Sequence, residues 1–494
     1  MKKALALIMA LLIAAGAFAA CSGGGNGTPS EVSQPETKSE SPAESAELSE
    51  EEPSVDPFDD GLPEKNYGGR EFRILQRTEF KYEFEEDESV PEKVNQLVAE
   101  RNRLVEDRFG VKITTVDQFG AWGRHEDFMN YIRNSVLLDD PGYDIIAGYA
   151  AIMPSAVGDD LFRNWHDLDE WINFEKTWWS QDIVDELTVN GKLYLLTGDI
   201  SMTFWDMMTC MFFNKDLAAT YNLTELYDLV RGHQWTFDKM LQICKDTYIP
   251  TDDEDSRIYS YCTQRTTQID VYQDAFGINV TEKDGEGRPY YTINSEKTGD
   301  ALRKVFSLVV GQPFTYIIPA DKTAYEEFFG LGRSLFEPLS LGDGIKLKNY
   351  DIDYGILPMP MYNEEQDDYY TTCRDNYSVF AVPASMSDDN LEFVGIITEA
   401  LCVESSRTVI PQYYNIVLKE RNTTDADSVE MIDLVRKGVR CNFGYLYSYA
   451  LDWPAHQLNV CINSENENFD TNWQSKEGMF EANLEEVLDY YFNN

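Results

Sequence analysis

Residues 94–116 read VNQLVAERNRLVEDRFGVKITTV, a stretch in which a helical pattern passes directly into a strand pattern. Its first part predicts a helix opened by Pro91, because the apolar side chains recur at helical spacing and share one face: Val94, Leu97, Val98, Leu104, Val105 and Phe109. Gly110 is a typical helix stop. Residues 111–116 then predict a strand, so the stretch is one helix that delivers the chain to a sheet.

The same alternation extends on both sides of this stretch. Residues 71–76 predict a strand before the helix, residues 126–138 predict a second helix, and residues 143–147 predict a third strand. Strands that alternate with helices indicate an α/β fold with a parallel sheet covered on both faces. In such sheets ligands bind beyond the carboxyl ends of the strands. We therefore expect the segments after Gln76, Val116 and Ala147 to face a cleft.

Further elements are predicted along the rest of the chain. Thr236 is a candidate N-cap, and other helices are expected near Gly299, near Asp389 and over residues 477–491. Short apolar strands are expected at 354–357 and 379–382. The chain beyond residue 65 is too long for a single hydrophobic core, so we expect two or more lobes.

The charge of the chain excludes one class of partner. The 494 residues include 87 Asp and Glu against 41 Lys and Arg, a formal net charge of −46. A nucleic-acid-binding protein needs the opposite sign. We therefore expect no nucleic-acid partner.

The N-terminus predicts export. Lys2 and Lys3 precede a run of small and apolar residues through Ala20, which is too short for a comfortable membrane span and is typical of a signal peptide, residues 1–20. Residues 18–21, FAAC, resemble the bacterial lipobox, in which Cys21 would receive diacylglycerol and become the mature N-terminus. The expected location is the cell membrane, facing outside the cytoplasm and held by lipid alone. The alternative is an ordinary cleaved signal with an incidental cysteine.

Residues 21–66 form a predicted tether. Gly, Ser, Pro and Glu dominate this segment, which buries too little apolar surface to offset its chain entropy. A disordered acidic linker between lipid and domain follows.

The remaining cysteines argue against a zinc site. None of the seven after Cys21 forms a CxxC pair. Export permits disulfides, but the pairing stays open, and Cys244 and Cys402 are expected to be buried free thiols on apolar helical faces.

Several segments together resemble a known family. They are residues 100–113 (ERNRLVEDRFGVKI), 143–146 (YDII), 191–194 (GKLY), 212–216 (FFNKD), 235–238 (WTFD) and 354–360 (YGILPMP). In their order and spacing they resemble family 1 of the extracellular solute-binding proteins, the sugar-binding class. The resemblance covers essentially all of the chain after the tether, and the chain is long enough that insertions are expected.

The resemblance implies a type II periplasmic-binding-protein-like fold, with two α/β lobes joined by a hinge and the ligand cleft between them. It places residues 67–206 and 335–383 in an N-terminal lobe, and residues 207–334 and 384–494 in a C-terminal lobe. It also implies a monomeric substrate-binding subunit of an ABC importer, without a cofactor. Such a subunit would capture a carbohydrate, with an oligosaccharide as the expected ligand, and deliver it to the transmembrane subunits of a permease.

Sugars have apolar C–H faces, on which aromatic rings stack, and hydroxyl rims, which Asp, Glu, Asn and Arg side chains bind. Candidate ligand contacts are residues of these types that follow predicted strands or lie near the expected crossings between lobes. They are Trp122, Asp206, Trp453, Tyr149, Trp205, Phe119, Asn376, Tyr377, Tyr445 and Tyr447. For each of them taken singly, core packing or surface exposure is the alternative interpretation.

Three other functions stay open. The same fold could bind a non-sugar solute such as a peptide, a polyamine, a metal or phosphate, and an acidic cleft or aromatic box would suit a cation. An exported glycan-active enzyme would need only two suitably spaced carboxylates. The chain has no GxSxG, HExxH or phosphate-loop motif, so we expect no enzyme. An adhesin or sensor partner built on the same fold is the third alternative.

Overall fold

The computed structural model describes residues 56–138, 142–253, 256–413 and 426–493. Signal peptide, Cys21 and most of the predicted tether lie outside these residues. Within the described ranges, no helix is both long and apolar enough to cross a bilayer.

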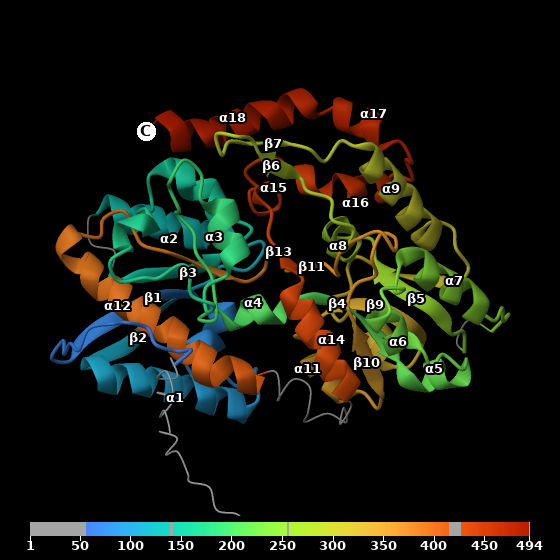
Figure 1. Ribbon diagram of the computed structural model, residues 1–494, viewed down its shortest axis with the longest axis horizontal. Helices are drawn as coiled ribbons and strands as arrows, with labels where there is room; N and C mark the ends of the chain where they lie inside the picture. Colours follow the sequence, from blue (N-terminus) through green and yellow to red (C-terminus); the bar gives the residue numbers. More distant parts are fainter. Residues whose placement is uncertain (1–55, 139–141, 254–255, 414–425, 494) are drawn as a thin grey trace, which may run out of the picture. The chain divides into compact units, whose positions relative to one another are not determined.

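The first lobe is built on a four-stranded sheet with the order β12-β3-β1-β2. Figure 1 labels β1, β2 and β3 of this sheet. Its strands are β1 (Arg70–Arg77), β2 (Val111–Gln118), β3 (Ile145–Tyr149) and β12 (Ser378–Ala381). β1 runs parallel to both β2 and β3, and β12 is antiparallel to β3. The helices of this lobe include α1 (Glu92–Phe109), α2 (His125–Leu137) and α12 (Asp388–Glu404).

The helix–strand prediction for residues 94–116 is confirmed. α1 buries Val94, Leu97, Val98, Val105 and Phe109. It ends at Gly110, whose φ of 60° lies in the left-handed region that glycine adopts without a Cβ clash. The chain therefore turns sharply, and Val111 starts β2 in register with Arg70.

The second lobe is built on a five-stranded sheet with the order β10-β4-β9-β5-β8. Its strands are β4 (Thr209–Asn214), β5 (Tyr259–Gln264), β8 (Thr315–Ile318), β9 (Ser334–Ser340) and β10 (Tyr354–Leu357). β5 is parallel to β8 and β9, whereas β4 is antiparallel to β9 and β10. Helices of this lobe include α7 (Phe237–Thr247), α8 (Thr267–Ala275) and α9 (Glu296–Val309). The predicted N-cap Thr236 accepts a hydrogen bond from the backbone N–H of Lys239.

Shorter elements connect these parts. The short helices are η1 (Thr78–Glu83), η2 (Met153–Asp159), η3 (Trp165–Leu168), α3 (Gln181–Leu187), α4 (Met202–Asp206), α5 (Lys215–Thr220), α6 (Leu226–Arg231), α10 (Glu327–Gly330), α11 (Asp343–Lys346), η4 (Leu347–Asn349), the π-helix η5 (Ser405–Val409), α15 (Phe443–Leu446), η6 (Pro454–His456), α16 (Gln457–Asn463) and α17 (Phe469–Gln474). The other elements are strands β6 (Thr281–Lys283), β7 (Pro289–Tyr291), β11 (Thr371–Thr372) and β13 (Val439–Arg440), with helices α14 (Ala426–Lys437) and α18 (Glu477–Asn493).

The strand pairing differs from the predicted division into lobes. β9 and β10 lie on either side of β4 in the second sheet, although residues 335–383 are expected in the first lobe. α12 packs against α1, although residues 384–494 are expected in the second lobe. Both differences have the same cause, since fully buried strands and apolar helix faces are covered by partners that are distant in the sequence.

Residues 57–66 also differ from the prediction, which includes them in a disordered tether. Arg108 of α1 donates to the carboxylate of Asp60 at 2.5 and 3.0 Å. Lys65 forms an ion pair with Glu392 of α12, and the guanidinium of Arg407 lies over the ring of Phe58. Charged and aromatic contacts therefore hold this segment against the first lobe.

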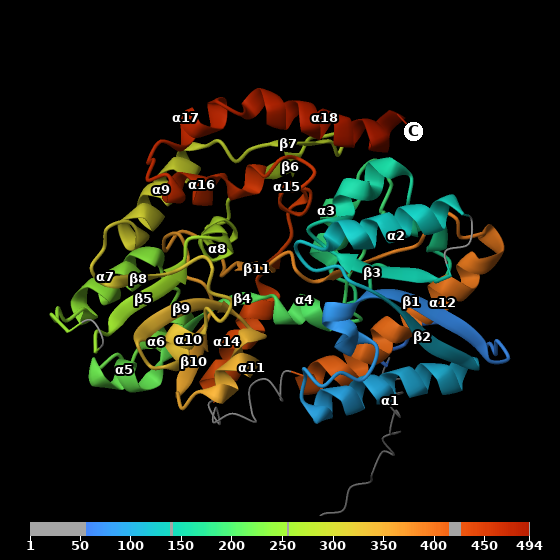
Figure 2. The same ribbon diagram turned by 180° about the vertical axis from the view of Figure 1, so that it is seen from behind.

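α18 contacts segments from both lobes and lies alongside β7 (Figures 1 and 2). On the side of the first lobe, the Tyr490 hydroxyl donates to Asp160 at 2.7 Å, and Asn190 donates to the carbonyl of Tyr491 at 2.9 Å. On the side of the second lobe, the Tyr291 hydroxyl donates to the carbonyl of Phe480 at 3.2 Å. The C-terminal helix thus fastens the two lobes to each other.

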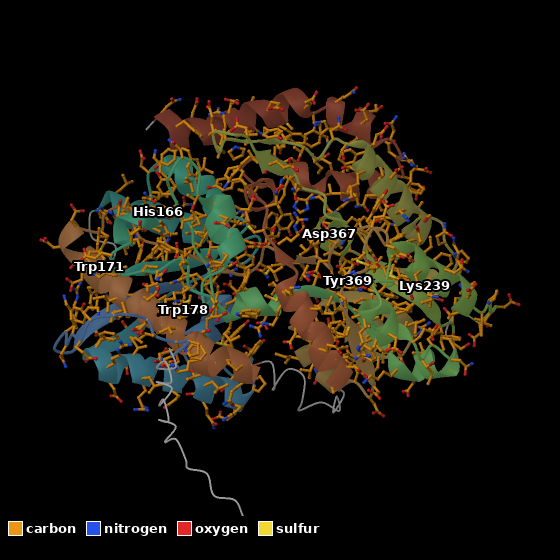
Figure 3. All side chains as sticks on the ribbon, in the orientation of Figure 1. His166, Trp171, Trp178, Lys239, Asp367 and Tyr369 are labelled. Atoms are coloured by element: carbon orange, nitrogen blue, oxygen red, sulfur yellow. The ribbon has the colours of Figure 1, made fainter. Side chains whose placement is uncertain are left out.

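A buried carboxylate organises the core of the first lobe. Trp178, labelled in Figure 3, donates its indole N–H to Glu399 at 3.0 Å, and Trp179 donates to the other oxygen at 2.8 Å. Burial raises the pKa of Glu399 to about 7, although the two indole donors act in the opposite direction. The predicted buried thiols Cys244 and Cys402 are confirmed, and all seven cysteines in the described residues are unpaired.

Candidate functional site

The carboxyl ends of β1, β2 and β3 lie at one edge of the first sheet, because the three strands are parallel neighbours. The segments that follow them begin at Thr78, Phe119 and Ala150. Residues of the second lobe, and of the segments that cross between the two lobes, contact this edge of the sheet. In open α/β sheets this is the position at which ligands bind.

A cluster of rings spans the two lobes at one end of this region. We call Trp122, His125, Tyr449 and Trp453 the aromatic cluster. Trp122 follows β2 and meets Trp453 of the second lobe edge to face, with ring centroids 5.7 Å apart. Tyr449 lies 5.6 Å from His125 and 5.4 Å from Trp453, again edge to face. Trp122 is 59% exposed, so its ring is available at the mouth of the cleft.

The backbone at Trp453 is strained. Asp452 and Trp453 have φ values of 64° and 70°, in the left-handed region that a bulky side chain rarely adopts. Each such residue costs roughly 1–3 kcal/mol and persists only where its surroundings enforce it. Strain of this kind concentrates at functional sites, and here it sets the direction of the Trp453 ring.

Below the aromatic cluster lies a buried histidine–carboxylate pair. His456 contacts Asp270 of α8 through Nδ1 at 2.6 Å, and the amide of Asn459 donates to the same carboxylate oxygen at 3.2 Å. Burial lowers the pKa of His456, but the carboxylates of Asp270 and Asp375 outweigh burial, and the net shift is upward. The pair therefore favours the protonated imidazole.

Arg77, the last residue of β1, is buried at this edge of the first sheet. Its guanidinium lies over the rings of Phe80 and Tyr149, 4.5 and 4.9 Å from their centroids. It donates to the side-chain oxygen of Asn376 at 3.2 Å and to Ser378 at 3.4 Å. The end of β1, the end of β3 and the crossing segment before β12 are thereby joined at one point.

A cavity of about 410 Å³ opens at the other end of this region. Its walls come from η1, from α4 and α11, from the segment before β12, and from Tyr413. The lining side chains that could bind a polar ligand are Phe80, Tyr82, Asp206, Tyr325, Asp343, Lys346, Arg374, Asn376 and Tyr413. Aromatic rings and hydrogen-bonding groups thus line the same space, as in many sites for small polar ligands.

Asp206 is held by two tyrosines in this cavity. The hydroxyls of Tyr82 and Tyr413 donate to its two carboxylate oxygens, the first at 2.7 Å. Burial raises the pKa of Asp206 to about 7; the Tyr82 hydrogen bond lowers it, and the nearby carboxylates of Glu83 and Asp343 raise it.

The second-lobe wall of the cavity is a network around Asp343. The carboxylate accepts hydrogen bonds from Ser340, from the Tyr325 hydroxyl at 3.0 Å and from Lys346 at 2.7 Å. Arg374 in turn donates to the Tyr325 hydroxyl at 3.4 Å. Arg374 and Asn376 flank Asp375, whose carboxylate interacts electrostatically with His456 and Tyr149. Asp375 thus lies between two residues of the cavity wall in the sequence and couples that wall electrostatically to His456, next to the aromatic cluster.

The structure brings some of the predicted site residues together in this cleft. Trp122 and Trp453 form its aromatic end, Tyr149 and Asn376 contact Arg77, and Asp206 lines the cavity. Tyr445 is buried with its ring 6.1 Å from that of His456. Phe119 is 51% exposed beside Trp122 in sequence, beneath the guanidinium of Arg124.

Three other predicted residues lie elsewhere. Trp205 packs under Arg436 and lines a separate cavity of about 170 Å³ with Trp178 and Trp179. Tyr377 is buried edge to face against Phe204. Tyr447 is buried between Phe443 and Tyr491.

Sequence reasoning missed several cleft residues. Arg77, Phe80 and Tyr82 directly follow the residues of β1 that were predicted as a strand, so the strand-end rule could have found them. Asp270 and Tyr325 carry no local signal, since their place in the cleft depends on tertiary packing. His456 and Tyr449 lie next to the late aromatic stretch, which offered a weak signal.

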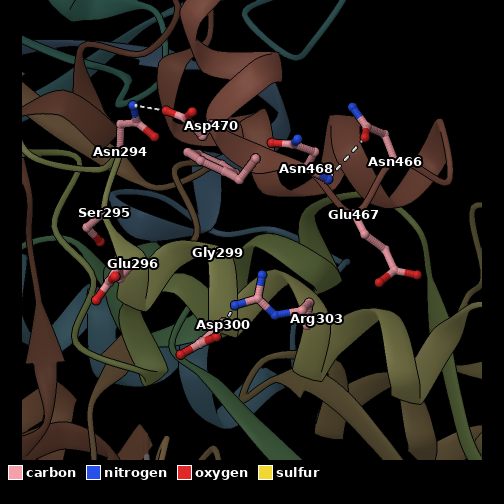
Figure 4. A pocket seen from close by; sticks show the side chains of 11 residues that line it. Asn294, Ser295, Glu296, Gly299, Asp300, Arg303, Asn466, Glu467, Asn468 and Asp470 are labelled. Carbon is pink, nitrogen blue, oxygen red and sulfur yellow. Dashed lines mark hydrogen bonds and ion pairs between the residues drawn. The ribbon is translucent and has the colours of Figure 1, made fainter.

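A larger surface depression than this cavity lies away from the cleft, in the second lobe. It has a volume of about 870 Å³ and is lined by the start of α9 and by residues 466–470 (Figure 4). Its polar groups bond to one another, since Asn294 donates to Asp470 at 3.0 Å and Arg303 pairs with Asp300. Because these polar groups already bond to one another, they are less available to a ligand than the groups that line the cleft.

Comparison with known proteins gives likenesses of structure. The chain matches no protein-family model and no curated protein sequence. Among solved structures, it is similar to an ABC substrate-binding protein from Listeria monocytogenes in complex with cycloalternan, with a TM-score of 0.56, 12% identity, and coverage of 84% of this chain and 99% of that one. It is also similar to a cyclo/maltodextrin-binding protein complexed with maltotetraose, with a TM-score of 0.57, 10% identity, and coverage of 84% of this chain and 97% of that one.

At such low identity these likenesses concern the fold. They confirm the predicted architecture: the chain has a type II periplasmic-binding-protein-like α/β fold, with two lobes and a cleft between them.

Proposed function

We propose that this protein is the substrate-binding lipoprotein of an ABC importer, which captures a carbohydrate in the interlobe cleft and delivers it unchanged to a membrane permease. In this proposal Cys21 carries the lipid anchor and the lobes face the outside of the cytoplasm. Both structural neighbours are binding proteins in complex with oligosaccharides, which supports an oligosaccharide ligand.

The observation that carries the proposal is the approach of Trp122 and Trp453 from opposite lobes, with centroids 5.7 Å apart. Indole rings provide broad flat faces for the C–H surface of a sugar ring. A ligand that touches both rings would be held by both lobes and would stabilise the closed arrangement.

The charges of the cleft favour a neutral ligand. Asp270 is paired with His456, and Asp343 is paired with Lys346. The carboxylate of Asp375 lies near the guanidinium of Arg374. A polyamine would need ionised carboxylates without cationic partners. Asp206 is bonded to two tyrosines and not to a cation, but burial raises its pKa to about 7, so the charges of the cleft still favour a polyhydroxylated neutral solute.

Isothermal titration calorimetry tests the proposal directly. The purified mature chain is titrated with maltotetraose, with cellotetraose and with spermidine. We expect an oligosaccharide to bind and spermidine not to bind. Binding of spermidine without any oligosaccharide, or release of shortened sugars during incubation, would contradict the proposal. The melting temperature with each compound gives a second readout, because a ligand specific to the folded state raises it.

The anchor is tested in a bacterial host by a single substitution. We expect the wild-type chain to fractionate with membranes and Cys21→Ser to lose this association. Cys461→Ser, which alters a buried cysteine of the folded domain, is the control and should leave fractionation unchanged. Equal membrane association of Cys21→Ser and wild type would argue against lipid anchoring.

A further inference from the structure

Several buried polar atoms in the cleft have no hydrogen-bonding partner among the described residues, and two of them belong to neighbouring side chains. These two are Oδ1 of Asp270 and Nε2 of His456, both buried. A buried donor or acceptor without a partner is destabilising, and most native proteins avoid it. Here two such atoms belong to one directly bonded pair, so a single external group could satisfy both.

The other atoms of the pair are firmly engaged. Oδ2 of Asp270 interacts with Nδ1 of His456 at 2.6 Å and accepts from Asn459 at 3.2 Å. Because Nδ1 faces a carboxylate, it carries the proton, and Nε2 is left free to interact elsewhere. The side chain of Asp270 is only 3% exposed, which fixes the orientation of the imidazole.

The pair lies directly below the aromatic cluster. The rings of Trp453 and His456 are 5.1 Å apart, and the strained backbone at Trp453 holds the indole in place. On the far side of Trp453 is Trp122 of the first lobe. Separation of the lobes would withdraw Trp122 and uncover the surface formed by Trp453 and His456.

We propose that Asp270 and His456 form a hydroxyl-binding subsite, in which Oδ1 of Asp270 accepts from one sugar hydroxyl and Nε2 of His456 donates to a hydroxyl oxygen of the same ring, seated on Trp453. The inference rests on the proposed function and specifies the part of the cleft that recognises the rim of the sugar. The ligand class is a carbohydrate with free adjacent hydroxyls on the ring that contacts Trp453.

Protonation of His456 determines the role of Nε2. The protonated imidazole is a charge-assisted donor, whereas the neutral imidazole with its proton on Nδ1 offers only an acceptor. The groups that face His456 are Asp270 from α8, Asp375 from the segment before β12, Asn459 from α16 and the ring of Tyr445 from α15. Burial lowers the pKa of His456, but the two carboxylates raise it and the net shift is upward, so the subsite keeps its donor–acceptor form to a higher pH than an ordinary histidine would.

Calorimetry with maltotetraose as the probe tests the subsite in the full mature chain. We expect Asp270→Asn and His456→Gln each to weaken binding at least about tenfold. We also expect wild-type affinity to be about fivefold lower at about pH 9 than at about pH 6. His456→Gln should remove this pH dependence. The matched controls are Asp169→Asn and His166→Gln, which alter a similar His–Asp pair, 3.0 Å apart, in the first lobe outside the cleft.

An NMR titration of the histidines tests the proposal without relying on the variants. The chain has four histidines, so elimination with single substitutions at His125, His166 and His233 assigns the remaining resonance to His456. We expect maltotetraose to shift that resonance and to raise the pKa of His456, because the ligand binds the protonated form better. Binding of maltotetraose with no effect on His456, and with full affinity in Asp270→Asn, would overturn the subsite. Absence of binding by any oligosaccharide would instead overturn the proposed function.

Discussion

Trp122 and Trp453 lie edge to face across the cleft, with ring centroids 5.7 Å apart, although 331 positions separate them in the chain numbering (453 minus 122). Trp122 is presented by the segment after β2 in the first lobe, and Trp453 by a strained turn in the second. The pair links the two lobes at the point where we place the ligand.

Trp453→Ala is expected to lower the affinity for a bound oligosaccharide at least about tenfold, because an aromatic anchor that the ligand covers commonly contributes about 2 kcal/mol or more. Trp122→Ala is expected to act in the same direction and less strongly, since its ring is 59% exposed. Calorimetry provides the measurement. Tyr290→Ala, which removes an exposed ring on β7, is the control and should bind as wild type does. Unchanged affinity in both Trp variants would remove these rings from the site.

Asp206 should make the folded protein less stable as the pH rises. Its folded-state pKa of about 7 lies above the ordinary aspartate value of 3.8, mainly because of burial. Between about pH 4 and about pH 7 the folded state therefore holds a proton that the unfolded state has lost, and the stabilising contribution declines by up to about 1.4 kcal/mol per pH unit.

Urea unfolding at a series of pH values checks this expectation. Asp206→Asn should flatten the dependence of the unfolding free energy on pH across that window, while the exposed Asp389→Asn should leave it as in wild type. A slope that is the same in Asp206→Asn and in wild type would show that Asp206 ionises normally in the folded protein.

Glu399→Ala should destabilise the first lobe strongly. The substitution leaves the indole N–H groups of Trp178 and Trp179 buried without an acceptor, at a cost of about 3 kcal/mol in unfolding free energy. Denaturant unfolding followed by tryptophan fluorescence measures this change. Glu392→Ala on the same helix removes a half-exposed ion pair with Lys65 and should cost less than about 1 kcal/mol. Equal effects of the two substitutions would contradict the importance of the buried carboxylate.

The attachment of α18 is expected to depend on Tyr491. Its ring is buried, and its hydroxyl bonds to that of Tyr447. Tyr491→Ala should lower the unfolding free energy by about 4 kcal/mol, because it leaves a large cavity and an unpaired hydroxyl. Hydrogen exchange should show faster exchange along α18, whereas Asn493→Ala, at an exposed position, should change neither property. Unaltered protection of α18 in Tyr491→Ala would show that other contacts suffice.

Much of the first lobe was predictable from local pattern. The apolar face of α1, the stop at Gly110 and the strand that follows are encoded within one stretch, because helical periodicity and a left-handed glycine act over a few residues. The placement of β9, β10 and α12 was not predictable in this way. In a fully buried strand such as β9, buried and exposed residues do not alternate, so the sequence does not indicate which strand lies next to it. The packing of the whole sheet selects the partner.

The same contrast applies to the cleft. Trp122 and Tyr149 were predictable because they follow strands of a parallel sheet, and that position alone indicates a ligand edge. Asp270 and Tyr325 were not predictable, because the local sequence around a helical carboxylate or a loop tyrosine does not indicate that the side chain will lie in the cleft. Trp205 shows that position in the sequence does not fix the direction of a side chain. It lies beside Asp206 in the chain, but its ring lines a separate cavity.

The sequence by itself determined the alternation of helices and strands, the excess of acidic residues and the aromatic residues available for a ligand, because these depend on composition and short-range periodicity. Only the tertiary structure decided which strands share a sheet, that Trp122 meets Trp453, and that Asp270 and His456 keep a buried acceptor and donor unpartnered among the described residues. Those relationships join residues that are far apart in the chain, and burial in a closely packed interior fixes them where no local rule can.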